Sequence, residues 1–475
     1  MADEKEDVNI LEAQGDSLDR SNDKALALLA AEGGRVFDPE GPEARAVKRK
    51  IDLHILPLLV ITVLLQNMDK ATLSYGSIMG LKTDTHLTAD EYSWLGSLVY
   101  FGFLAWEIPT HILIQKLPLA RYASITVILH VAVLAGWRHV VSSSASLVNR
   151  IAFWFGTGAV AQVTGGALAY GVYSIKHPSL HTWQIYFLIL GLLTVCHGIL
   201  LVFGLGASPT QASWLSEDEK IIALERLRTG KTGTETHRFK KSQMIEAFQD
   251  VRLYLFFLIM VCTGLPNGGV GAFGPAIIKA FGFNTGETTL LSMAPGVSEA
   301  IGVVVGCLLA KTTRSRCWSG VACIAVAVIG VIMMLAIPTE QKYARYAGYC
   351  LLYWWPVCVI FVLSWLSSCV SGTTKKVMFN LAYNLGYCVG NILGPQTFRA
   401  SDAPNYPIAK GVMLAFIIMS GVFLILIWGV HLIWNKRRDR QDAADKAAGI
   451  VYEVPLNVEF LDLTDKEQRA FRYPL

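Results

Sequence analysis

The feature that most constrains this chain is a series of long, almost uninterrupted apolar blocks. The first begins near Ile51, and most are 20 residues long or longer. A helix needs about 20 apolar residues to span the hydrocarbon core of a bilayer. Charged residues make up only 16% of the 475 residues, against about 25% in soluble domains. The chain is therefore predicted to be an all-α integral membrane protein. A soluble enzyme, a secreted disulfide scaffold and a nucleic-acid binder are excluded.

The apolar blocks form two groups that a polar stretch separates. The blocks are 51–68, 93–115, 119–140, 151–175 and 182–206, and then 252–282, 287–310, 317–337, 346–371, 377–398 and 408–435. The predicted organisation is an N-terminal tail over 1–50, a first half of five spans over 51–206, a middle loop over 207–251, a second half of six spans over 252–435 and a C-terminal tail over 436–475.

Basic clusters predict which side of the membrane each end faces, because cytoplasmic loops carry an excess of Lys and Arg. The N-terminal tail, the middle loop and the C-terminal tail all carry such clusters. The six blocks of the second half satisfy this pattern. The first half does not, because two cytoplasmic ends require an even number of crossings. Only about ten residues separate His139 from Arg150, and a helix of that length rises about 15 Å. One spanning helix is predicted to be missing there.

Several segments of the chain resemble one transporter family. They include QNMDKATLSYGSIMGL (66–81), EYSWLGSLVYFGFLAWEIPTHILIQKLPLARY (91–122), NGGVGAFGPAIIKAFGF (267–283) and NVEFLDLTDKEQRAFRYPL (457–475). These segments resemble fungal allantoate-permease-like transporters, in the anion:cation symporter branch of the major facilitator superfamily. The resemblance implies a two-half helical bundle with 12 spans, of which about 11 are found here. It also identifies the missing span as the fourth, whose Arg and Glu in the family have no counterpart in this chain.

The first candidate site follows the first apolar block. The resemblance places a cation at Lys70, and charges inside a span are usually functional. Lys70 is predicted to attract the carboxylate of an anionic substrate, with Asp69 as its partner and Ser74 further along the same face. The alternative is a pair at the membrane interface whose charged ends reach water.

Glu107 lies within the second block, in LAWEIPTH. A carboxylate in a medium of low dielectric constant has a raised pKa and can bind and release a proton near neutral pH. Because the fourth-span Glu is missing, Glu107 and Asp69 are the predicted proton-coupling residues. The alternative for Glu107 is a structural hydrogen bond to a neighbouring helix.

The block 252–282 contains the sequence LPNGGVGAFGP. Its prolines and glycines predict a broken helix, which is tolerated at membrane depth only beside a cavity or other protein. Asn267 and Phe273 are predicted to contact the substrate there. The alternative is a kink that serves the rocking of the two halves.

Two further polar side chains lie in apolar blocks. Gln162 is predicted to contact a ureido or amide group, with contact between helices as the alternative. Asn384 is predicted to face the cavity. It lies among Gly386, Gly390 and Gly394, whose four-residue spacing favours close approach of two helices.

The predicted function is proton-coupled uptake of a small organic anion by alternating access. The resemblance offers allantoate, ureidosuccinate, nicotinate, pantothenate and small peptides as substrates and does not choose among them. The partners expected are this anion, a proton and the lipid bilayer, with the protein as a monomer in the plasma membrane and both termini in the cytoplasm. No cofactor, metal, nucleic acid or enzymatic activity is expected. The alternatives are an inactive or sensor-like isoform without the fourth span, and a carrier that exports a metabolite.

Overall fold

The computed structural model describes residues 41–116, 144–176, 178, 180–204, 214–216, 218–219, 222, 240–448 and 463–474. These residues form helices and turns and contain no strand, which confirms the all-α prediction. The first half contains α2 (Pro42–Ile78), α3 (Leu81–Asp84), α4 (Ala89–Lys116), α6 (Ser144–Tyr173) and α7 (Thr182–Gly204). The remainder contains α9 (Lys241–Phe248), α10 (Val251–Ala280), α11 (Thr285–Leu291), α12 (Ala294–Thr313), α13 (Arg316–Ala336), α14 (Lys342–Leu352), α15 (Val357–Cys369), α16 (Thr373–Gln396), the short 3₁₀ helix η2 (Ala400–Asp402) and α17 (Pro407–Ala447).

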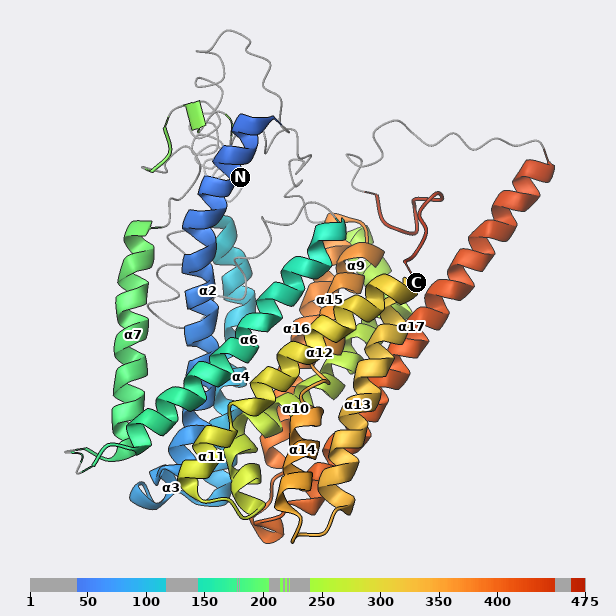
Figure 1. The fold of residues 1–475 in the computed structure, drawn as a ribbon. Coiled ribbons are helices and arrows are strands. Elements are labelled where there is room, and N and C mark those ends of the chain that lie inside the picture. The colour runs from blue at the N-terminus through green and yellow to red at the C-terminus, as the bar shows by residue number, and fades with distance from the viewer. Residues whose placement is uncertain are drawn as a thin grey trace, which may run out of the picture.

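The long helices run side by side between two ends of the bundle, with α7 at one edge and α17 at the other (Figure 1). Six of the described segments are apolar and long enough to cross a membrane. They are Thr182–Leu201, Val251–Ala280, Thr285–Thr313, Arg316–Ala336, Lys342–Cys369 and Pro407–Ala447. Side-chain caps begin several helices at the membrane ends. The side chain of Ser315 accepts a hydrogen bond from the backbone of α13, and Asn284 forms a capping box with Glu287 at the start of α11.

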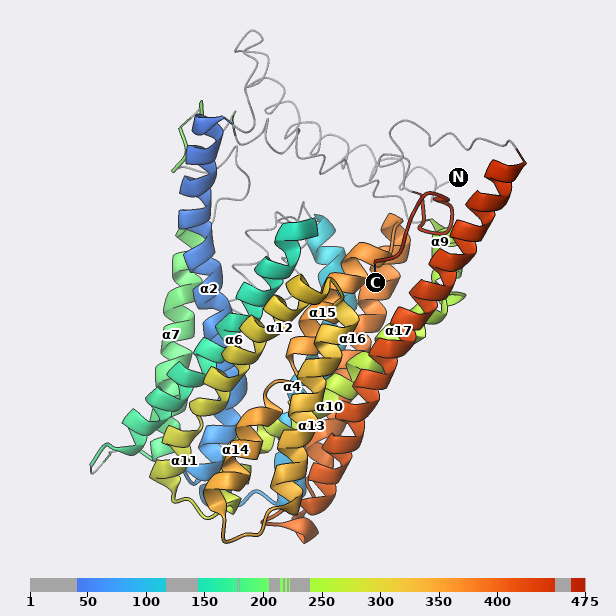
Figure 2. The same ribbon diagram turned by 45° about the vertical axis from the view of Figure 1, so that its right-hand side comes forward.

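We call the end of the bundle where α2 begins and α17 ends the tail side, and the opposite end the far side. Helices α2 and α6 run from the tail side to the far side, and α4 and α7 run back (Figures 1 and 2). Lys50 near the start of α2 forms an ion pair of 2.6 Å with Glu219 of the middle loop. Both ends of the first half therefore lie on the tail side, which agrees with the basic clusters of the sequence.

The interval between α4 and α6 begins and ends on the tail side (Figure 2). It contains the 27 residues 117–143, which are enough for one spanning helix and too few for two. The predicted block 119–140 lies outside the described residues. The four described long helices of this half give an even number of crossings.

Helix α10 corrects one prediction of the sequence analysis. The prolines and glycines of 252–282 predicted a broken helix, but Val251–Ala280 is one continuous helix that contains Pro266 and Pro275. Its glycines allow close packing instead of a break. A Cβ atom on Gly268 would lie 2.4 Å from the backbone oxygen of Asn391 in α16, and one on Gly390 would lie 2.4 Å from the backbone oxygen of Val261. The close approach predicted for the glycines of α16 is confirmed, with α10 as the partner helix.

The breaks occur in two other spans of the second half. The predicted block 287–310 is divided between α11 and α12 at Ser292–Met293, and the predicted block 346–371 is divided between α14 and α15 at Tyr353–Pro356. A proline follows each interruption, since Pro295 lies at the start of α12 and Pro356 precedes α15. Both broken spans pack against α6. The breaks thus lie where the two halves meet.

A C-terminal segment, Leu463–Pro474, docks on the tail side of the second half. Its Asp465 is fully buried and lies 2.6 Å from Arg252 of α10 and 2.8 Å from Lys375 of α16. The indole nitrogen of Trp365 in α15 donates a hydrogen bond of 2.7 Å to the backbone oxygen of Pro474. The segment therefore joins the tail-side ends of α10, α15 and α16.

Candidate functional site

Lys70 lies at the middle of the bundle, on the face of α2 that is turned toward the second half. Its Nζ atom lies 5.6 Å from the ring centroid of Phe103 in α4, and it is close enough to Cys388 of α16 to interact with it electrostatically. Lys70 is half-buried and forms no ion pair with a described carboxylate. An ammonium group so placed can bind an anion between the two halves.

Gln162 connects the halves directly. Its Nε2 atom donates a hydrogen bond of 2.9 Å from α6 to the hydroxyl of Tyr353, which lies in the break between α14 and α15. The Tyr353 hydroxyl also lies 3.2 Å from that of Tyr349. The break therefore places a hydroxyl pair opposite the amide of Gln162, and hydroxyl and amide groups can both donate and accept hydrogen bonds.

Asn267 lies in a polar network between α10 and α16. Its Nδ2 atom donates to the hydroxyl of Tyr387 at 2.8 Å and to Oδ1 of Asn391 at 2.6 Å. The ring of Tyr100 in α4 lies 6.2 Å from that of Tyr387, edge to face. The network therefore reaches the boundary with the first half. Tyr100 and Tyr387 were not identified as site residues from the sequence.

The other two polar candidates are placed differently. Asn384 is half-buried and precedes Cys388 by one helical turn of α16, on the side of that helix that Lys70 approaches. Ser74 is buried one turn beyond Lys70, and its hydroxyl donates a hydrogen bond of 2.8 Å to the backbone oxygen of Ala71 in its own helix. Ser74 thus shares the face of Lys70, but its donor is already used within α2.

Phe273 lies in an aromatic cluster on the far side and not with the polar groups. Its ring stacks on Phe398 at 4.5 Å and meets Tyr92 edge to face at 5.2 Å. The hydroxyl of Tyr92 donates a hydrogen bond of 2.7 Å across the halves to the backbone oxygen of Ala272. This cluster connects α4 with α10 and α16 at the far side.

Of the two predicted proton-coupling residues, the structure describes the side chain of Asp69 but not that of Glu107. Asp69 is exposed on α2, within electrostatic reach of Lys70 and of Tyr186 in α7. The backbone of Glu107 belongs to α4, but its side chain lies outside the described residues.

Glu299 is an acidic residue that the sequence analysis missed. It lies on α12, one turn after Gly296, and a Cβ atom on Gly296 would touch the side chain of Gln162 at 3.0 Å. Glu299 also interacts electrostatically with Tyr353. The block 287–310 begins with Glu287, which caps α11, and Glu299 is the carboxylate in its interior. That position could have identified it, because a carboxylate inside a spanning segment is costly unless it has a function.

The arrangement as a whole is a polar site between two helical halves. One cation, one carboxylate, amides and phenolic hydroxyls are contributed by α2, α6, α10, α12, α16 and the break between α14 and α15. Among the described residues, no group of three or more His, Cys, Asp or Glu could hold a metal ion. Both halves supply groups that can donate and accept hydrogen bonds.

A sequence profile of the Major Facilitator Superfamily matches residues 148–395, which is more than half of the chain. The chain belongs to the major facilitator superfamily. The two-half helical bundle that the sequence predicted is the fold of this superfamily.

Curated relatives of this major facilitator chain are fungal transporters. The allantoate permease of Saccharomyces cerevisiae is 33% identical over 498 positions, with 94% of this chain and 90% of the permease covered. The uncharacterized transporter C1773.15 of Schizosaccharomyces pombe is 31% identical, with 99% of each chain covered. That match extends over 508 positions and this chain has 475 residues, so at least 33 positions of the relative have no counterpart here.

Solved structures with the same fold are also transporters. A bacterial homologue of the human lysosomal transporter Spinster, inward-facing and unoccupied, has a TM-score of 0.54 at 15% identity and covers 82% of this chain and 97% of its own. A D-xylose–proton symporter has a TM-score of 0.53 at 11% identity and covers 78% of this chain and 97% of its own. At identities of 11% and 15%, these similarities show the fold of this chain and not its substrate.

Proposed function

We propose that this transporter moves a small organic anion through the membrane by alternating access, coupled to protons. The observation that carries the proposal is the position of Lys70, a half-buried cation at the boundary of the halves that forms no ion pair with a described carboxylate. A substrate carboxylate would neutralise it. The relative named allantoate permease supports a ureido acid such as allantoate as the first substrate to test.

The amide and hydroxyl groups would bind the uncharged end of the substrate. Gln162 and Tyr353 form one side of the site and Asn267 with Tyr387 forms the other. These groups come from both halves, so binding would be sensitive to the angle between the halves. Asn384 completes the face of α16 that Lys70 approaches.

Proton coupling is assigned to carboxylates near this site. The sequence proposed Asp69 and Glu107, and the geometry adds Glu299. Glu299 lies beside the Gln162–Tyr353 pair, so a proton on its carboxylate would change the charge that the substrate meets. Coupling follows if the substrate binds the protonated state better than the deprotonated state.

Movement between the two states would require the far-side contacts to open. Tyr92 bonds to Ala272, and the hydroxyl of Ser97 donates a bond of 2.9 Å from α4 to the backbone oxygen of Ile392 in α16. Breaking and remaking such bonds as the halves rock would expose the central site to one side at a time. We place the tail side in the cytoplasm of a cell bounded by the plasma membrane, because the basic clusters lie there.

The direct test is uptake of radiolabelled allantoate and of a small set of other carboxylates into proteoliposomes with an inward proton gradient. The substitution Lys70→Ala should abolish uptake of the transported anion, and Lys70→Arg should retain part of it. Lys342→Ala is the matched control, because Lys342 packs on Phe283 and Tyr343 at the start of α14 and is outside the site. Full uptake by Lys70→Ala would contradict the proposed role of Lys70.

The second candidate is an isoform that does not transport, and the short interval between α4 and α6 favours it. Sequencing of cDNA across the codons for 146–151 decides whether one further helix is encoded there. Additional codons would mean that the twelve-span transporter is the protein to assay. An uninterrupted junction together with no uptake of any carboxylate would favour the isoform that does not transport.

A further inference from the structure

Arg345 is a buried cation near the far-side end of the second half. It lies one turn into α14 and is only 5% exposed. Its Nη2 atom makes two long contacts, 3.4 Å to the backbone oxygen of Met334 and 3.5 Å to Oδ1 of Asn405. Its Nε and Nη1 atoms are buried and make no hydrogen bond among the described residues. Two of the donors of this guanidinium group are therefore available.

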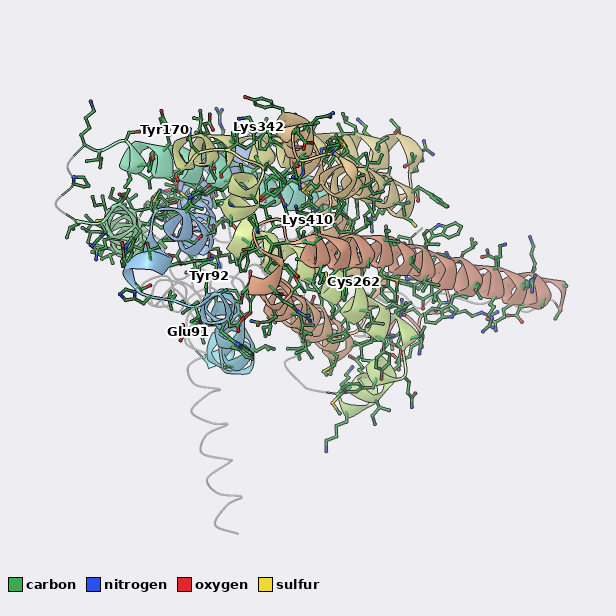
Figure 3. All side chains as sticks on the ribbon, turned by 90° about the horizontal axis from the view of Figure 1, so that it is seen from below. Glu91, Tyr92, Tyr170, Cys262, Lys342 and Lys410 are labelled. Carbon is green, nitrogen blue, oxygen red and sulfur yellow. The ribbon has the colours of Figure 1, made fainter. Side chains whose placement is uncertain are left out.

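Lys410 is a second buried cation close to Arg345. It lies one turn into α17 and is 1% exposed. Its Nζ atom lies 5.2 Å from the ring centroid of Phe281, and the guanidinium carbon of Arg345 lies 4.9 Å from the same centroid. The two charges are thus within about 10 Å of each other. Figure 3, seen from the far side, shows Lys410 among the helices of the second half and Lys342 nearer the margin.

No carboxylate among the described residues neutralises this pair. Neither Arg345 nor Lys410 forms an ion pair within 4.0 Å with a carboxylate in the described part of the chain. Asp402 is the nearest acidic residue along the chain before α17. Its Oδ1 atom accepts a bond of 3.4 Å from the hydroxyl of Ser401, and its Oδ2 atom is buried with no hydrogen-bond partner among the described residues. Buried charges in proteins are normally paired, because removal from water is costly for each ion. Arg345 and Lys410 depart from this rule, because both are buried, both are cationic, and no described residue serves as their counterion.

The start of α17 adds to the positive potential at this place. Helix α17 begins at Pro407 with no side-chain cap, so the first backbone N–H groups and the positive end of the helix dipole are not neutralised by a side chain. Asn405, which contacts Arg345, leads directly into this helix start. The guanidinium group, the ammonium group and the helix start therefore converge on one region.

We propose that Arg345 and Lys410 bind a small anion on the far side of the second half. The ligand class is a compact monovalent anion, either a halide such as chloride or a small carboxylate. It would accept hydrogen bonds from Nε and Nη1 of Arg345 and interact with the ammonium group of Lys410. This site is separate from the central one at Lys70 and does not depend on the proposed transport function.

The test is the thermal stability of the purified full-length protein in detergent, measured at constant ionic strength. Chloride or formate replaces the bulky anion gluconate in steps, because a ligand that binds the folded state raises the melting temperature with its concentration. The wild-type melting temperature should rise with chloride, with formate or with both, and the Lys410→Met variant should lose this rise. The Lys342→Met variant should keep it, because Lys342 starts the same helix as Arg345 but packs on Phe283 and Tyr343.

Equilibrium binding of ³⁶Cl⁻ to the same proteins provides a second measurement that does not rely on stability. A larger effect of formate than of chloride would identify a carboxylate site, and the reverse would identify a halide site; both results support the proposal. Equal melting temperatures of the wild type in chloride, formate and gluconate would overturn it. Retention of the full anion effect by Lys410→Met would also overturn it.

Discussion

Asp465 of the C-terminal segment lies 2.6 Å from the guanidinium group of Arg252 in the first turn of α10, and both side chains are fully buried. Lys375 of α16 bonds to the other oxygen of the same carboxylate at 2.8 Å. The hydroxyl of Tyr473 donates a further bond of 2.8 Å to Asp465. Asp465 therefore joins cations from two helices of the second half, both of which also pair with Asp250.

Substitution of Asp465 by Asn should strongly destabilise the second half. It leaves Arg252 and Lys375 buried with less compensation, and removal of one partner of a buried ion pair costs about 3–5 kcal/mol. Thermal unfolding in detergent measures the effect. Asp442→Asn is the control, since Asp442 pairs with Arg472 at the exposed surface, where an ion pair contributes about 1 kcal/mol or less. Equal melting temperatures of the two variants would contradict the structural role of Asp465.

The pH dependence of this ion cluster can also be predicted. Burial by itself would raise the pKa of Asp465, but Arg252 and Lys375 more than offset it and lower the pKa to about 2. A depressed pKa in the folded state stabilises the protein above the unfolded value of about 3.9, and this contribution is lost as the pH falls toward 2. The difference in melting temperature between wild type and Asp465→Asn should be constant from pH 8 to pH 5 and shrink below about pH 4. A decrease of this difference in melting temperature between pH 7 and pH 5 would be inconsistent with a pKa of about 2 for Asp465.

The contact between α10 and α16 should not tolerate a methyl group at Gly268. A Cβ atom there would lie 2.4 Å from the backbone oxygen of Asn391, so Gly268→Ala forces the helices apart. Overpacking of this kind costs about 1–3 kcal/mol or more. Gly271→Ala in the same helix is the control, because nothing lies within 4 Å of its added Cβ atom. In size-exclusion chromatography after stepwise heating, the folded peak of Gly268→Ala should disappear at a lower temperature than that of the wild type. The peak of Gly271→Ala should disappear at the same temperature as that of the wild type.

The Tyr353 hydroxyl should contribute to substrate binding. Tyr353→Phe removes the acceptor of the Gln162 hydrogen bond, which is 2.9 Å long, and a hydrogen bond of this kind contributes about 0.5–1.5 kcal/mol. The apparent KM for the transported anion should rise about 2- to 12-fold with the protein still folded. Tyr343→Phe, exposed on α14, should leave KM unchanged. A fall in maximal rate without a change in KM would assign Tyr353 to the conformational change and not to binding.

The membrane fold could be predicted because block length and charge are local properties. An apolar run of 20 residues has few alternatives to a spanning helix, whichever helices it later contacts. The position of the helix breaks could not be predicted in this way. The glycines near Asn267 suggested a break, but glycine serves equally for close packing, and only the position of α16 distinguishes the two uses.

The candidate site was predicted in part, for a related reason. Lys70, Gln162 and Asn267 are polar residues within or next to apolar blocks. The structure places Lys70 and Gln162 at the boundary of the halves and Asn267 in a network that reaches it through Tyr387. Phe273 has no polar signal and lies in the far-side aromatic cluster. Glu299, like Lys70, is a charged residue in an apolar stretch, so the sequence could have identified it as a candidate site residue. Arg345 and Lys410 lie near helix ends, where cations are common, so only their burial in the fold distinguishes them.

The docking of the C-terminal segment has a practical consequence for biosynthesis. Asp465 follows every described helix in the sequence, so its ion pairs with Arg252 and Lys375 can form only after α17 has been synthesised. A product that stops at the end of α17 would keep all its spanning helices and still lack this anchor. Such a product would also leave the indole N–H of Trp365 without its acceptor, the backbone oxygen of Pro474.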